Sequence, residues 1–516
     1  MALIGPVAKS TARVQKIYND RIRVYDYFKQ YAVLRKLIEK SKDTEFGKKY
    51  DFAKILKSKD PATLFSELVP IHTYDQFYDS WLQRTLDGEQ NVFWGEKIKY
   101  FALSSGTGGA SSKKIPVSKS MIYNCRKIGV SQLSSIYNLN MPSSFYEKNV
   151  LMLGGSTNLK KVGEHYEGDL SGILVSNTPK WFSRFKKPNE DIAQIENWDE
   201  KIEAIVEMAP KWDIGILSGF PSWFQILIKK IMERYEVDDI HQIWPNYKIF
   251  MHGGVYFEPY KQTFQSFSEE PVHYLNTYLA SEGFFAFQRG IGTDGMQLLL
   301  KSGVYFEFVP FNAQNFDGEG QLKPEAKAIQ LKDVDRGVEY ALVISTSSGL
   351  WRYLIGDTVR FTSLLNYEIE LTGRIQSYLN ICGEHLSSAN LLQAIQKVSE
   401  TLRINIQEFT VLAGEDKNGF YHHWHIGTDD TDYSTETIAY LLDKYLCAAN
   451  DDYQTERKYV LKTIKVDCHP TQKFYDFLKH IGKNGSQNKF PITLKGERAK
   501  EWEGYLMQNE KGKVQN

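Results

Sequence analysis

A run of hydroxyls, glycines and two lysines between two apolar segments is the feature that most constrains this chain. Residues 104–116 read SSGTGGASSKKIP, with the apolar residues 100–103 before them and the apolar residues 115–117 at their end. Glycine permits tight turns that bring backbone N–H groups close to an anion, hydroxyls add neutral donors, and lysines add charge. The pattern predicts a loop that holds a polyphosphate. A solvated hairpin loop of the same composition is the alternative.

The composition sets the outer limits. A chain of 516 residues is too long for one core, so we expect two or three domains. Its 63 basic residues balance its 63 acidic ones, which argues against a nucleic-acid surface. No run of about 18 apolar residues occurs, and the N-terminal apolar stretch is too short for a signal sequence. We therefore expect no membrane partner, and the wide spacing of Cys125, Cys382, Cys447 and Cys468 predicts reduced thiols in the cytoplasm.

The order of apolar patterns predicts an α/β fold. Helical spacing dominates the first hundred residues, after which short apolar runs alternate with helical stretches, as in a partly parallel sheet. Residues 282–361 are rich in strand signals separated by turns typical of antiparallel sheet. We expect several β-sheets in a large N-terminal domain over residues 1–372, and a small mobile α+β domain over residues 373–516.

Two further segments carry residues suited to a nucleotide. Tyr278 and Glu282 lie at the exit of an apolar run, where a ring can stack and a carboxylate can bind a metal ion. Asp357 directly follows Gly356, and a carboxylate in such a place can accept two hydrogen bonds from a vicinal diol such as ribose. For each acid, an ordinary residue in a turn is the alternative. Gly373 next to Arg374 is a plausible hinge, because glycine absorbs large dihedral changes.

Several patterns are set aside. The glycines of residues 290–295 match G-x-G-x-x-G, but strand-like runs flank them on both sides, so we predict a hairpin turn and no dinucleotide site. The run His422, His423, Trp424, His425 resembles a metal site. On a strand only His423 and His425 share a face, and we expect no partner carboxylate or cysteine near them and therefore no metal there.

The three motifs, in this order and spacing, resemble the plant auxin-responsive acyl-acid amido synthetases and their bacterial relatives. That family belongs to the adenylate-forming superfamily, together with acyl-CoA ligases and luciferase. Residues 44–47, 69–75 and 98–101, and Glu384 with its neighbours, are similar to the family's flanking sequences. The resemblance covers nearly the whole chain and implies the adenylate-forming fold, with ATP and Mg²⁺ as cofactors.

The resemblance also implies a role for each motif residue. Tyr278 stacks on adenine, Asp357 with Arg374 holds the ribose hydroxyls, and Glu282 binds Mg²⁺. Lys114 and Lys489 reach the phosphates as catalytic lysines. Other residues implied to bind ATP are Ser104, Ser105, Gly106, Thr107, Gly108, Ser112, Lys113, Gly253, Gly254 and Ser281. Lys489 lies in a segment where Ile492 replaces the arginine usual in the family.

The implied reaction has two halves. A carboxylic acid attacks the α-phosphorus of ATP and releases pyrophosphate, and the amine of an amino acid then displaces AMP to form an amide. Small-molecule acids and amino acids are the expected partners of a monomer or weak dimer. An acyl-CoA synthetase that uses the same adenylate, and a catalytically silent nucleotide-binding protein, are the alternatives. Nothing in the sequence identifies the acid.

Overall fold

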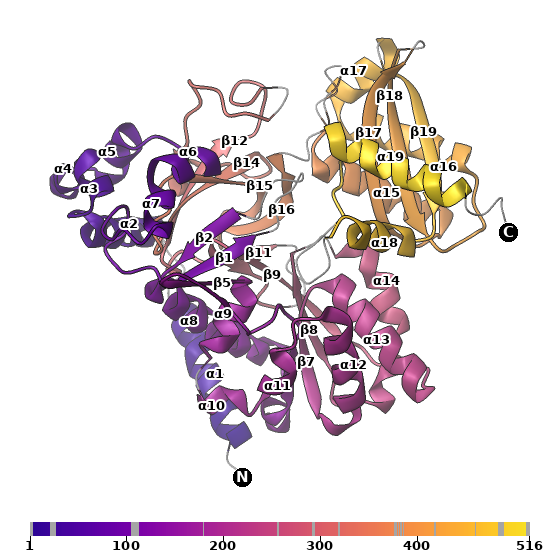
Figure 1. Cartoon of the computed structure of the whole chain (residues 1–516), viewed down its shortest axis with the longest axis horizontal. Helices are drawn as coiled ribbons and strands as arrows, with labels where there is room; N and C mark the ends of the chain where they lie inside the picture. Colours follow the sequence, from indigo (N-terminus) through magenta and orange to yellow (C-terminus); the bar gives the residue numbers. More distant parts are fainter. Residues whose placement is uncertain are drawn as a thin grey trace.

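The computed structural model (Figure 1) describes the greater part of the chain. The described residues are 4–20, 27–104, 113–178, 180–254, 257–290, 295–317, 320–375, 379, 381, 384, 386–416, 419–459, 461–482 and 490–511. No helix in these ranges is both long and apolar enough to span a bilayer. Three sheets organise this part of the chain.

The largest sheet is mixed. Its strands follow the order β13-β12-β14-β15-β16-β11-β10-β9-β8-β7-β3-β6. Strands β9, β8, β7, β3 and β6 pair in parallel, whereas the strands from β13 to β9 pair antiparallel. The predicted change from partly parallel to antiparallel sheet is therefore confirmed. The bounds are β3 (Asn149–Met152), β6 (Lys186–Lys187), β7 (Ile214–Gly219), β8 (Ile249–Gly253), β9 (His273–Ala280), β10 (Gly283–Phe287), β11 (Met296–Leu298), β12 (Val304–Pro310), β13 (Ile329–Gln330), β14 (Glu339–Thr346), β15 (Tyr353–Ser363) and β16 (Glu368–Arg374).

Helices cover the parallel half of this sheet. Parallel strands need crossover connections, and here α12 (Trp198–Met208), α13 (Pro221–Tyr235) and α14 (Glu258–Ser266) follow strands in that half. Buried aromatic side chains, among them Phe224, Trp244 and Phe250, fill the layer between sheet and helices. Smaller elements complete this region: α8 (Lys119–Ser135), η2 (Ile136–Leu139), η3 (Ser143–Glu147), α9 (Leu170–Ser176), α10 (Lys180–Ser183), α11 (Glu190–Ala193), η4 (Ala209–Lys211), η5 (Ile240–Gln242) and α1 (Ile4–Asp20).

A small second sheet carries the ends of the glycine-rich loop. Its order is β2-β1-β5-β4, with β1 (Tyr100–Ser104), β2 (Lys113–Val117), β4 (Lys160–Val162) and β5 (His165–Gly168). Strands β1 and β2 pair antiparallel, and Ser104 stands opposite Lys113 where the loop leaves and returns. The loop residues 105–112 themselves lie outside the described residues.

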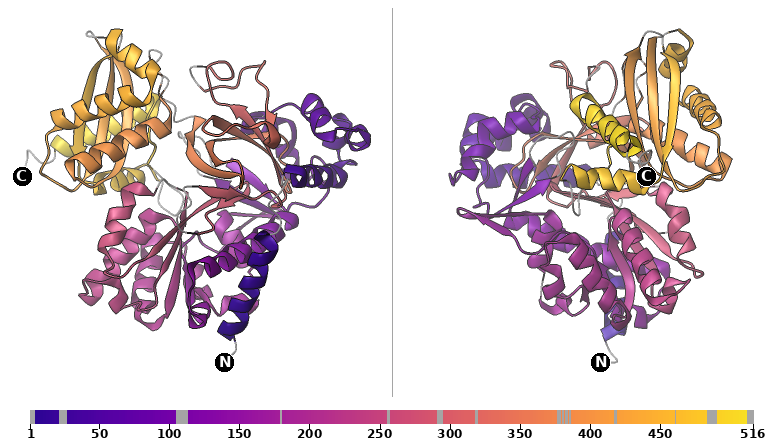
Figure 2. Two further views of the ribbon diagram at one scale, coloured as in Figure 1. Left: turned by 180° about the vertical axis from the view of Figure 1, so that it is seen from behind. Right: turned by 45° about the vertical axis from the view of Figure 1, so that its right-hand side comes forward.

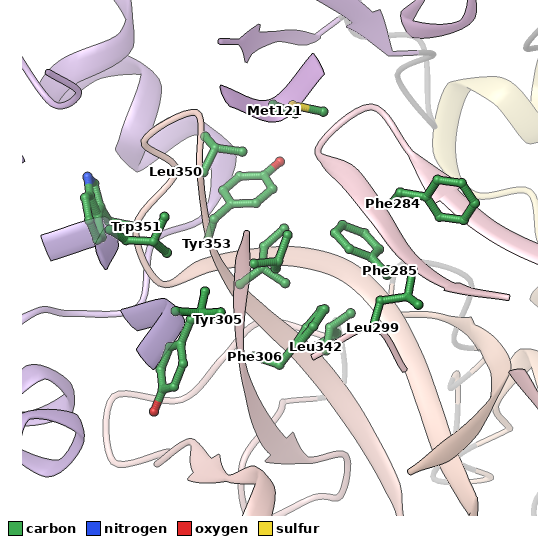
Figure 3. Close-up of a cluster of buried hydrophobic side chains, with 14 of the residues drawn as sticks. Met121, Phe284, Phe285, Leu299, Tyr305, Phe306, Leu342, Leu350, Trp351 and Tyr353 are labelled. Atoms are coloured by element: carbon green, nitrogen blue, oxygen red, sulfur yellow. The ribbon is translucent and has the colours of Figure 1, made fainter. Parts of the chain in front are cut away.

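The N-terminal helices pack on the antiparallel half of the large sheet. In Figure 3 side chains from β10, β12, β14 and β15 converge with Met121 of α8 in one apolar cluster. At its edge the fully buried Trp351 stacks on Phe46, with ring centroids 5.7 Å apart. The elements on this side are α2 (Tyr27–Ser41), α3 (Glu45–Lys49), α4 (Phe52–Lys57), α5 (Pro61–Leu68), α6 (Tyr74–Phe77), η1 (Tyr78–Leu82), α7 (Gln83–Leu86) and η6 (Leu331–Asp333).

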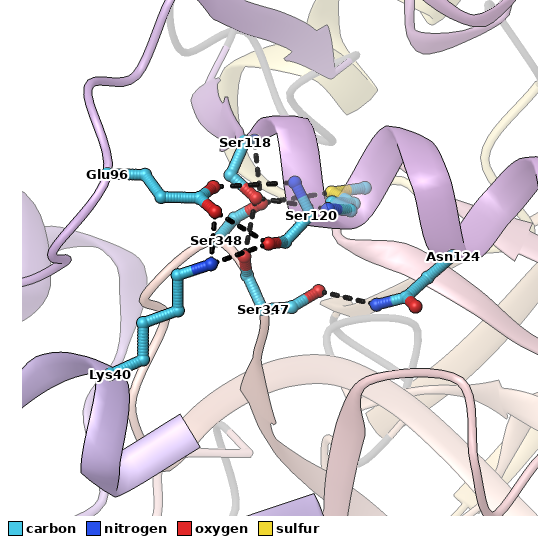
Figure 4. Close-up of polar contacts among 8 residues, drawn as sticks. Lys40, Glu96, Ser118, Ser120, Asn124, Ser347 and Ser348 are labelled. Carbon is cyan, nitrogen blue, oxygen red and sulfur yellow. Dashed lines mark hydrogen bonds and ion pairs between the residues drawn. The ribbon is translucent and has the colours of Figure 1, made fainter. Parts of the chain in front are cut away.

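A buried polar network fixes the turn between β14 and β15 against the start of α8 (Figure 4). Ser118, the N-cap of α8, accepts a hydrogen bond from the backbone of Met121, and its own backbone N–H donates to Ser348 Oγ at 2.9 Å. Lys40, Glu96 and Ser120 form a separate, partly exposed set of polar contacts beside it. Buried polar groups are stable only when paired, so this network holds the β14–β15 turn in one position.

A three-stranded sheet with helices on both faces forms the C-terminal part (Figure 2). Strand β18 (Gly419–Thr428) lies between β17 (Ile406–Asp416) and β19 (Leu461–His469), antiparallel to the first and parallel to the second. Trp424 faces a core with α15 (Ser388–Leu402) and α16 (Thr435–Ala449), and α17 (Asp451–Tyr459) lies beside them. Leu412 faces the opposite core with α18 (Gln472–His480) and α19 (Gly496–Lys511).

Candidate active site

Asp357 projects from a bulge in β15. Along β14 and β15, Ala341 pairs with Thr358 and Val343 with Leu354, so Leu342 stands opposite the residues 355–357. Such a bulge kinks a strand and re-aims its side chains. Gly356 within it has φ of 93°, and a Cβ there would meet no atom within 4 Å. The glycine is therefore needed for its backbone conformation, not for space.

Two side chains, one from the adjacent strand β16 and one from the more distant strand β9, hold the buried Asp357 carboxylate. Tyr278, near the end of β9, donates its hydroxyl to Oδ2 at 2.6 Å. Arg374, the register partner of Asp357 at the end of β16, donates from Nε to Oδ1 at 3.0 Å. Charge-assisted bonds of this kind are the strong ones. The structure thus brings together three of the predicted site residues, each from a different strand.

Glu282 lies in the two-residue turn between β9 and β10, beside Ser281. Its carboxyl is buried, and burial, reinforced by the negative charge of Asp357, raises its pKa to about 7. The positive charges of Lys113 and Arg374 act in the opposite direction. A cation bound beside these two carboxyl groups would remove the repulsion between them.

The two lysines of the loop diverge because neighbouring residues of a strand point to opposite faces. Lys113 lies over the ring of Tyr74, with Nζ 5.1 Å from the ring centroid. Burial lowers the pKa of Lys113, and Glu282 opposes that shift most strongly. Lys114 instead forms an ion pair with Glu167 of β5, at 2.6 Å. The structure therefore places Lys113 near the carboxyl groups of Glu282 and Asp357, and Lys114 next to Glu167.

Gly253 ends β8 in the parallel half of the sheet, and Gly254 follows it. Gly254 has φ of 82°, and a Cβ there would lie 2.1 Å from the ring of Phe220. A Cβ on Gly253 would lie 2.3 Å from the carbonyl oxygen of Thr277, the residue before Tyr278. Any side chain would be excluded at both positions. The backbone at the end of β8 thus lies directly against the strand that carries Tyr278.

Several predicted residues lie outside the described residues: Ser105, Gly106, Thr107, Gly108, Ser112 and Lys489. Ser104 is described, at the end of β1. The implied nucleotide-binding roles of Ser104 and of these undescribed residues stay predictions.

Three residues that the sequence did not single out border the site. Tyr74 accepts a hydrogen bond from the backbone N–H of Lys114 at 2.8 Å. Tyr353 is fully buried, and the charge of Glu282 adds to the effect of burial in raising its pKa. Glu167 accepts from Lys114 and contacts His165 at 3.0 Å. Tyr74 lies within residues 69–75, which are similar to the family's sequences, and Tyr353 lies three residues before Gly356. Nothing in the spacing of these two residues distinguishes them from tyrosines of the hydrophobic core.

Sequence profiles of one family match most of the chain. The GH3 family N-terminal domain matches residues 28–163 and 156–272, the central domain residues 297–374, and the C-terminal domain residues 389–498. The chain belongs to the GH3 family. The family predicted from the three motifs is confirmed, since its named members are amido synthetases. One relative, indole-3-acetic acid-amido synthetase GH3.2 of Arabidopsis thaliana, is 23% identical over 445 residues, which cover 72% of this chain and 78% of the relative.

Solved structures of GH3 and CoA-ligase proteins share the fold. The GH3.15 acyl acid amido synthetase matches with a TM-score of 0.77 and 16% identity, covering 96% of each chain. A 2-hydroxyisobutyryl-CoA ligase in the postadenylation state matches with a TM-score of 0.59 and 11% identity, covering 93% of this chain and 91% of that one. The predicted adenylate-forming fold is therefore confirmed.

Proposed function

We propose that this GH3 protein is an ATP-dependent acyl-acid amido synthetase. It converts a carboxylic acid and ATP to an acyl adenylate and pyrophosphate, and then transfers the acyl group to the amine of an amino acid. The observation that carries the proposal is the cluster of Tyr278, Glu282, Asp357 and Arg374, with Lys113 beside it, in the fold of this family. The names of the GH3 relatives support the amide-forming second half.

Asp357 is the proposed ribose-binding group. Each of its oxygens accepts one protein hydrogen bond and keeps a second lone pair for a ligand hydroxyl. Tyr278 and Arg374 fix the plane of the carboxylate before the nucleotide arrives, which reduces the entropy lost on binding. Tyr278 is 4% exposed and its hydroxyl is bonded to Asp357, and its stacking on adenine stays part of the proposal.

Glu282 is the proposed Mg²⁺ ligand, and the residues present fit that ion. Mg²⁺ prefers carboxylate oxygens and substrate phosphates, and Glu282 is a buried carboxyl that lacks a direct ion pair in the described part of the chain. When bound, the ion neutralises negative charge on the α-phosphate as the acid attacks. Lys113, on the face of β2 that is turned toward Glu282, adds a positive charge. Lys114 and Lys489 stay proposed as further phosphate contacts, Lys114 after release from Glu167.

Water must be kept from the acyl adenylate, because this mixed anhydride hydrolyses readily. We propose that residues 373–516 form the small domain that closes over the site and that Gly373 is the hinge. Gly373 has φ of 152°, and a Cβ there would meet the side chain of Ser388 at 2.4 Å. Arg374, which binds Asp357, immediately follows, so rotation at this hinge is coupled to the ribose contact.

A pyrophosphate-exchange screen tests the proposal. Purified protein with ATP and Mg²⁺ is offered aromatic, fatty and keto acids, and at least one acid should drive exchange of labelled pyrophosphate into ATP. AMP release with that acid should then be stimulated by amino acids. Stimulation by CoA alone would favour the acyl-CoA synthetase that the ligase-like fold also permits. Silence with every acid would contradict the enzyme assignment.

We propose a monomer or weak dimer with small-molecule partners, and a cytoplasmic location. Cys125, Cys447 and Cys468 are free thiols in the described part of the chain, as in a reducing compartment.

A further inference from the structure

The histidine run of β18 acquires partners that its sequence does not reveal. His423 and His425 share one face of the strand, and the parallel strand β19 places Asp467 directly opposite His425 and His469 opposite Gly427. The expectation that no carboxylate lies nearby is therefore wrong. Asp467 is more than 40 residues away in the sequence, and only the pairing of β18 with β19 brings it to these imidazoles.

The side chains converge at the spacing of metal ligands. His423 Nε2 lies 2.8 Å from Asp467 Oδ2, and His425 Nδ1 lies 3.1 Å from His469 Nε2. One ligand atom from each of His423, His425 and Asp467 falls within 4.8 Å of the other two. Ligand atoms about 2.0–2.2 Å from a tetrahedral Zn²⁺ lie about 3–3.5 Å from one another, so small movements are enough to close the site.

The cluster has one buried side and one side that is open to solvent, and both suit a metal site. His425 is 1% exposed, and in the described part of the chain its buried Nε2 has no hydrogen-bond partner. The side chains of His423 and Asp467 are 19% and 55% exposed, which gives an ion a path from solvent. Lys465, opposite His423 on β19, has its ammonium over the ring of Tyr421, 4.0 Å from the centroid.

We propose that His423, His425 and Asp467 bind one first-row divalent transition-metal ion, for which Zn²⁺ is the natural probe. Two imidazoles and one carboxylate form a ligand set that such ions prefer, and Mg²⁺ does not favour nitrogen donors. His469 is a positioning residue, since its contact with His425 orients that ring. The site is separate from the nucleotide cluster. Its ion ties β18 to β19 and so stabilises the three-stranded sheet.

Zinc binding to the full-length protein tests the proposal. Protein freed of metal with EDTA and then desalted is titrated with ZnCl₂ against a chromophoric zinc indicator, with Mg²⁺ in excess throughout. We expect one tight equivalent. H423Q and D467N should each weaken Zn²⁺ binding at least about 10-fold, and H469Q should weaken it about 10-fold. His480 is an exposed histidine on α18, so H480Q is the matched control and should bind as the unchanged protein does.

A spectroscopic readout keeps the test independent of stability. Co²⁺ added in place of Zn²⁺ should give the visible bands of a nitrogen- and oxygen-ligated site of low coordination number, and H423Q should lose them. Circular dichroism of each variant must match that of the unchanged protein, and the half-buried His423 and the exposed Asp467 are the members of the cluster least able to disturb the core. Zinc bound with equal affinity by H423Q, D467N and H480Q, or no tight equivalent at all, would overturn the proposal.

Discussion

The Asp357 carboxylate combines a backbone distortion with two fixed hydrogen bonds. Gly356 turns the strand so that the carboxylate leaves the regular alternation of β15, and Tyr278 and Arg374 then hold its two oxygens. The chemical identity of these residues could be predicted from their motifs. Which of Lys113 and Lys114 lies beside Glu282 could not be predicted. The answer depends on which face of β2 is turned toward Glu282, and the pairing of β2 in its sheet determines that face.

Asp357→Asn should raise the ATP requirement with little change in the maximal rate. The substitution keeps the volume but weakens charge-assisted contacts to Arg374 and to the ribose, each worth about 1.5–3 kcal/mol. We expect KM for ATP to rise at least about 10-fold in acid-dependent pyrophosphate exchange. Glu370→Gln is the control, because Glu370 pairs with Arg360 at the exposed side of β16. An unchanged KM would remove Asp357 from the ribose site.

Glu282→Gln should stop adenylation without weakening the fold. Glutamine matches the shape of the side chain but cannot replace a carboxylate on Mg²⁺, so we expect pyrophosphate exchange to fall at least about 100-fold. Because burial disfavours the charged carboxyl, the neutral variant should unfold at the same temperature as the unchanged protein or higher. Thermal unfolding and exchange are measured on the same sample. Full exchange activity in this variant would contradict the Mg²⁺ assignment.

At the scale of elements, hairpins were more predictable than bulges. The glycine-rich residues 290–295 were expected to form a turn, and β10 and β11 on either side do pair antiparallel. Strand signals over residues 282–361 also located the region that contains β10 to β14 and most of β15. An isolated glycine in a strand marks a bulge, a bend or a close approach of backbone, and the sequence around Gly356 does not show which of these applies.

Gly356→Ala should impair ATP binding through the backbone. Alanine at φ of 93° costs about 1–3 kcal/mol, and relief of that strain moves Asp357. Gly337→Ala is a matched control, because Gly337 has φ of 83° and equally open surroundings. Both variants should lose similar stability, whereas only Gly356→Ala should raise KM for ATP, by about 10-fold. Equal kinetics in the two variants would show that the bulge does not aim Asp357.

A buried ion pair ties the β14–β15 turn to the N-terminal helices. Arg352 Nε donates to Glu307 Oε2 of β12 at 3.0 Å, and Nη1 donates to the carbonyl oxygens of Ser66 and Val69 at 2.8 and 2.6 Å. Arg352 is 5% exposed and Glu307 is 1% exposed. Arg352 thus has a structural role, a few residues before Asp357 with its proposed nucleotide role.

Arg352→Met should destabilise the protein by about 3–5 kcal/mol, because it leaves Glu307 buried without a partner. Adding Glu307→Gln should restore part of that loss by removing the unpaired charge. Arg360→Met, at an exposed ion pair, should cost about 0–1 kcal/mol. Chemical denaturation measures all three. A loss from Arg352→Met no larger than that from Arg360→Met would show that the buried pair contributes nothing.

At the scale of the whole molecule, polar contacts join the C-terminal part to the helices of the parallel sheet. Gln225 donates to Gln407 at 2.8 Å, and Tyr260 of α14 donates to Glu408 Oε1 of β17 at 2.8 Å. Tyr475 of α18 donates to the same oxygen at 3.1 Å. These contacts hold the described arrangement of the two parts. Sequence patterning could not reveal them, because the partners lie more than 60 residues apart.

Glu408 should make stability depend on pH. Burial raises its pKa from the usual 4.5 to about 7, although the hydrogen bonds from Tyr260 and Tyr475 act against the rise. The folded state therefore binds this proton more tightly than the unfolded state, and stability is lost as pH rises from about 4.5 through 7. Glu408→Gln should flatten the fall in unfolding temperature between about pH 4.5 and about pH 7. The exposed Glu370→Gln should keep it, and equal slopes would contradict this reading.

Transfer of oxygen from the acid to AMP tests the central claim most directly. The acid that drives exchange is labelled with ¹⁸O in its carboxylate and incubated with the protein, ATP, Mg²⁺ and an amino acid. Attack on the α-phosphorus leaves one acid oxygen bridging to AMP, and displacement by the amine releases it there. Mass spectrometry should find one ¹⁸O in each AMP formed and an amide that retains the other. Label in inorganic phosphate or pyrophosphate, or amide formed with unlabelled AMP, would contradict an adenylate intermediate.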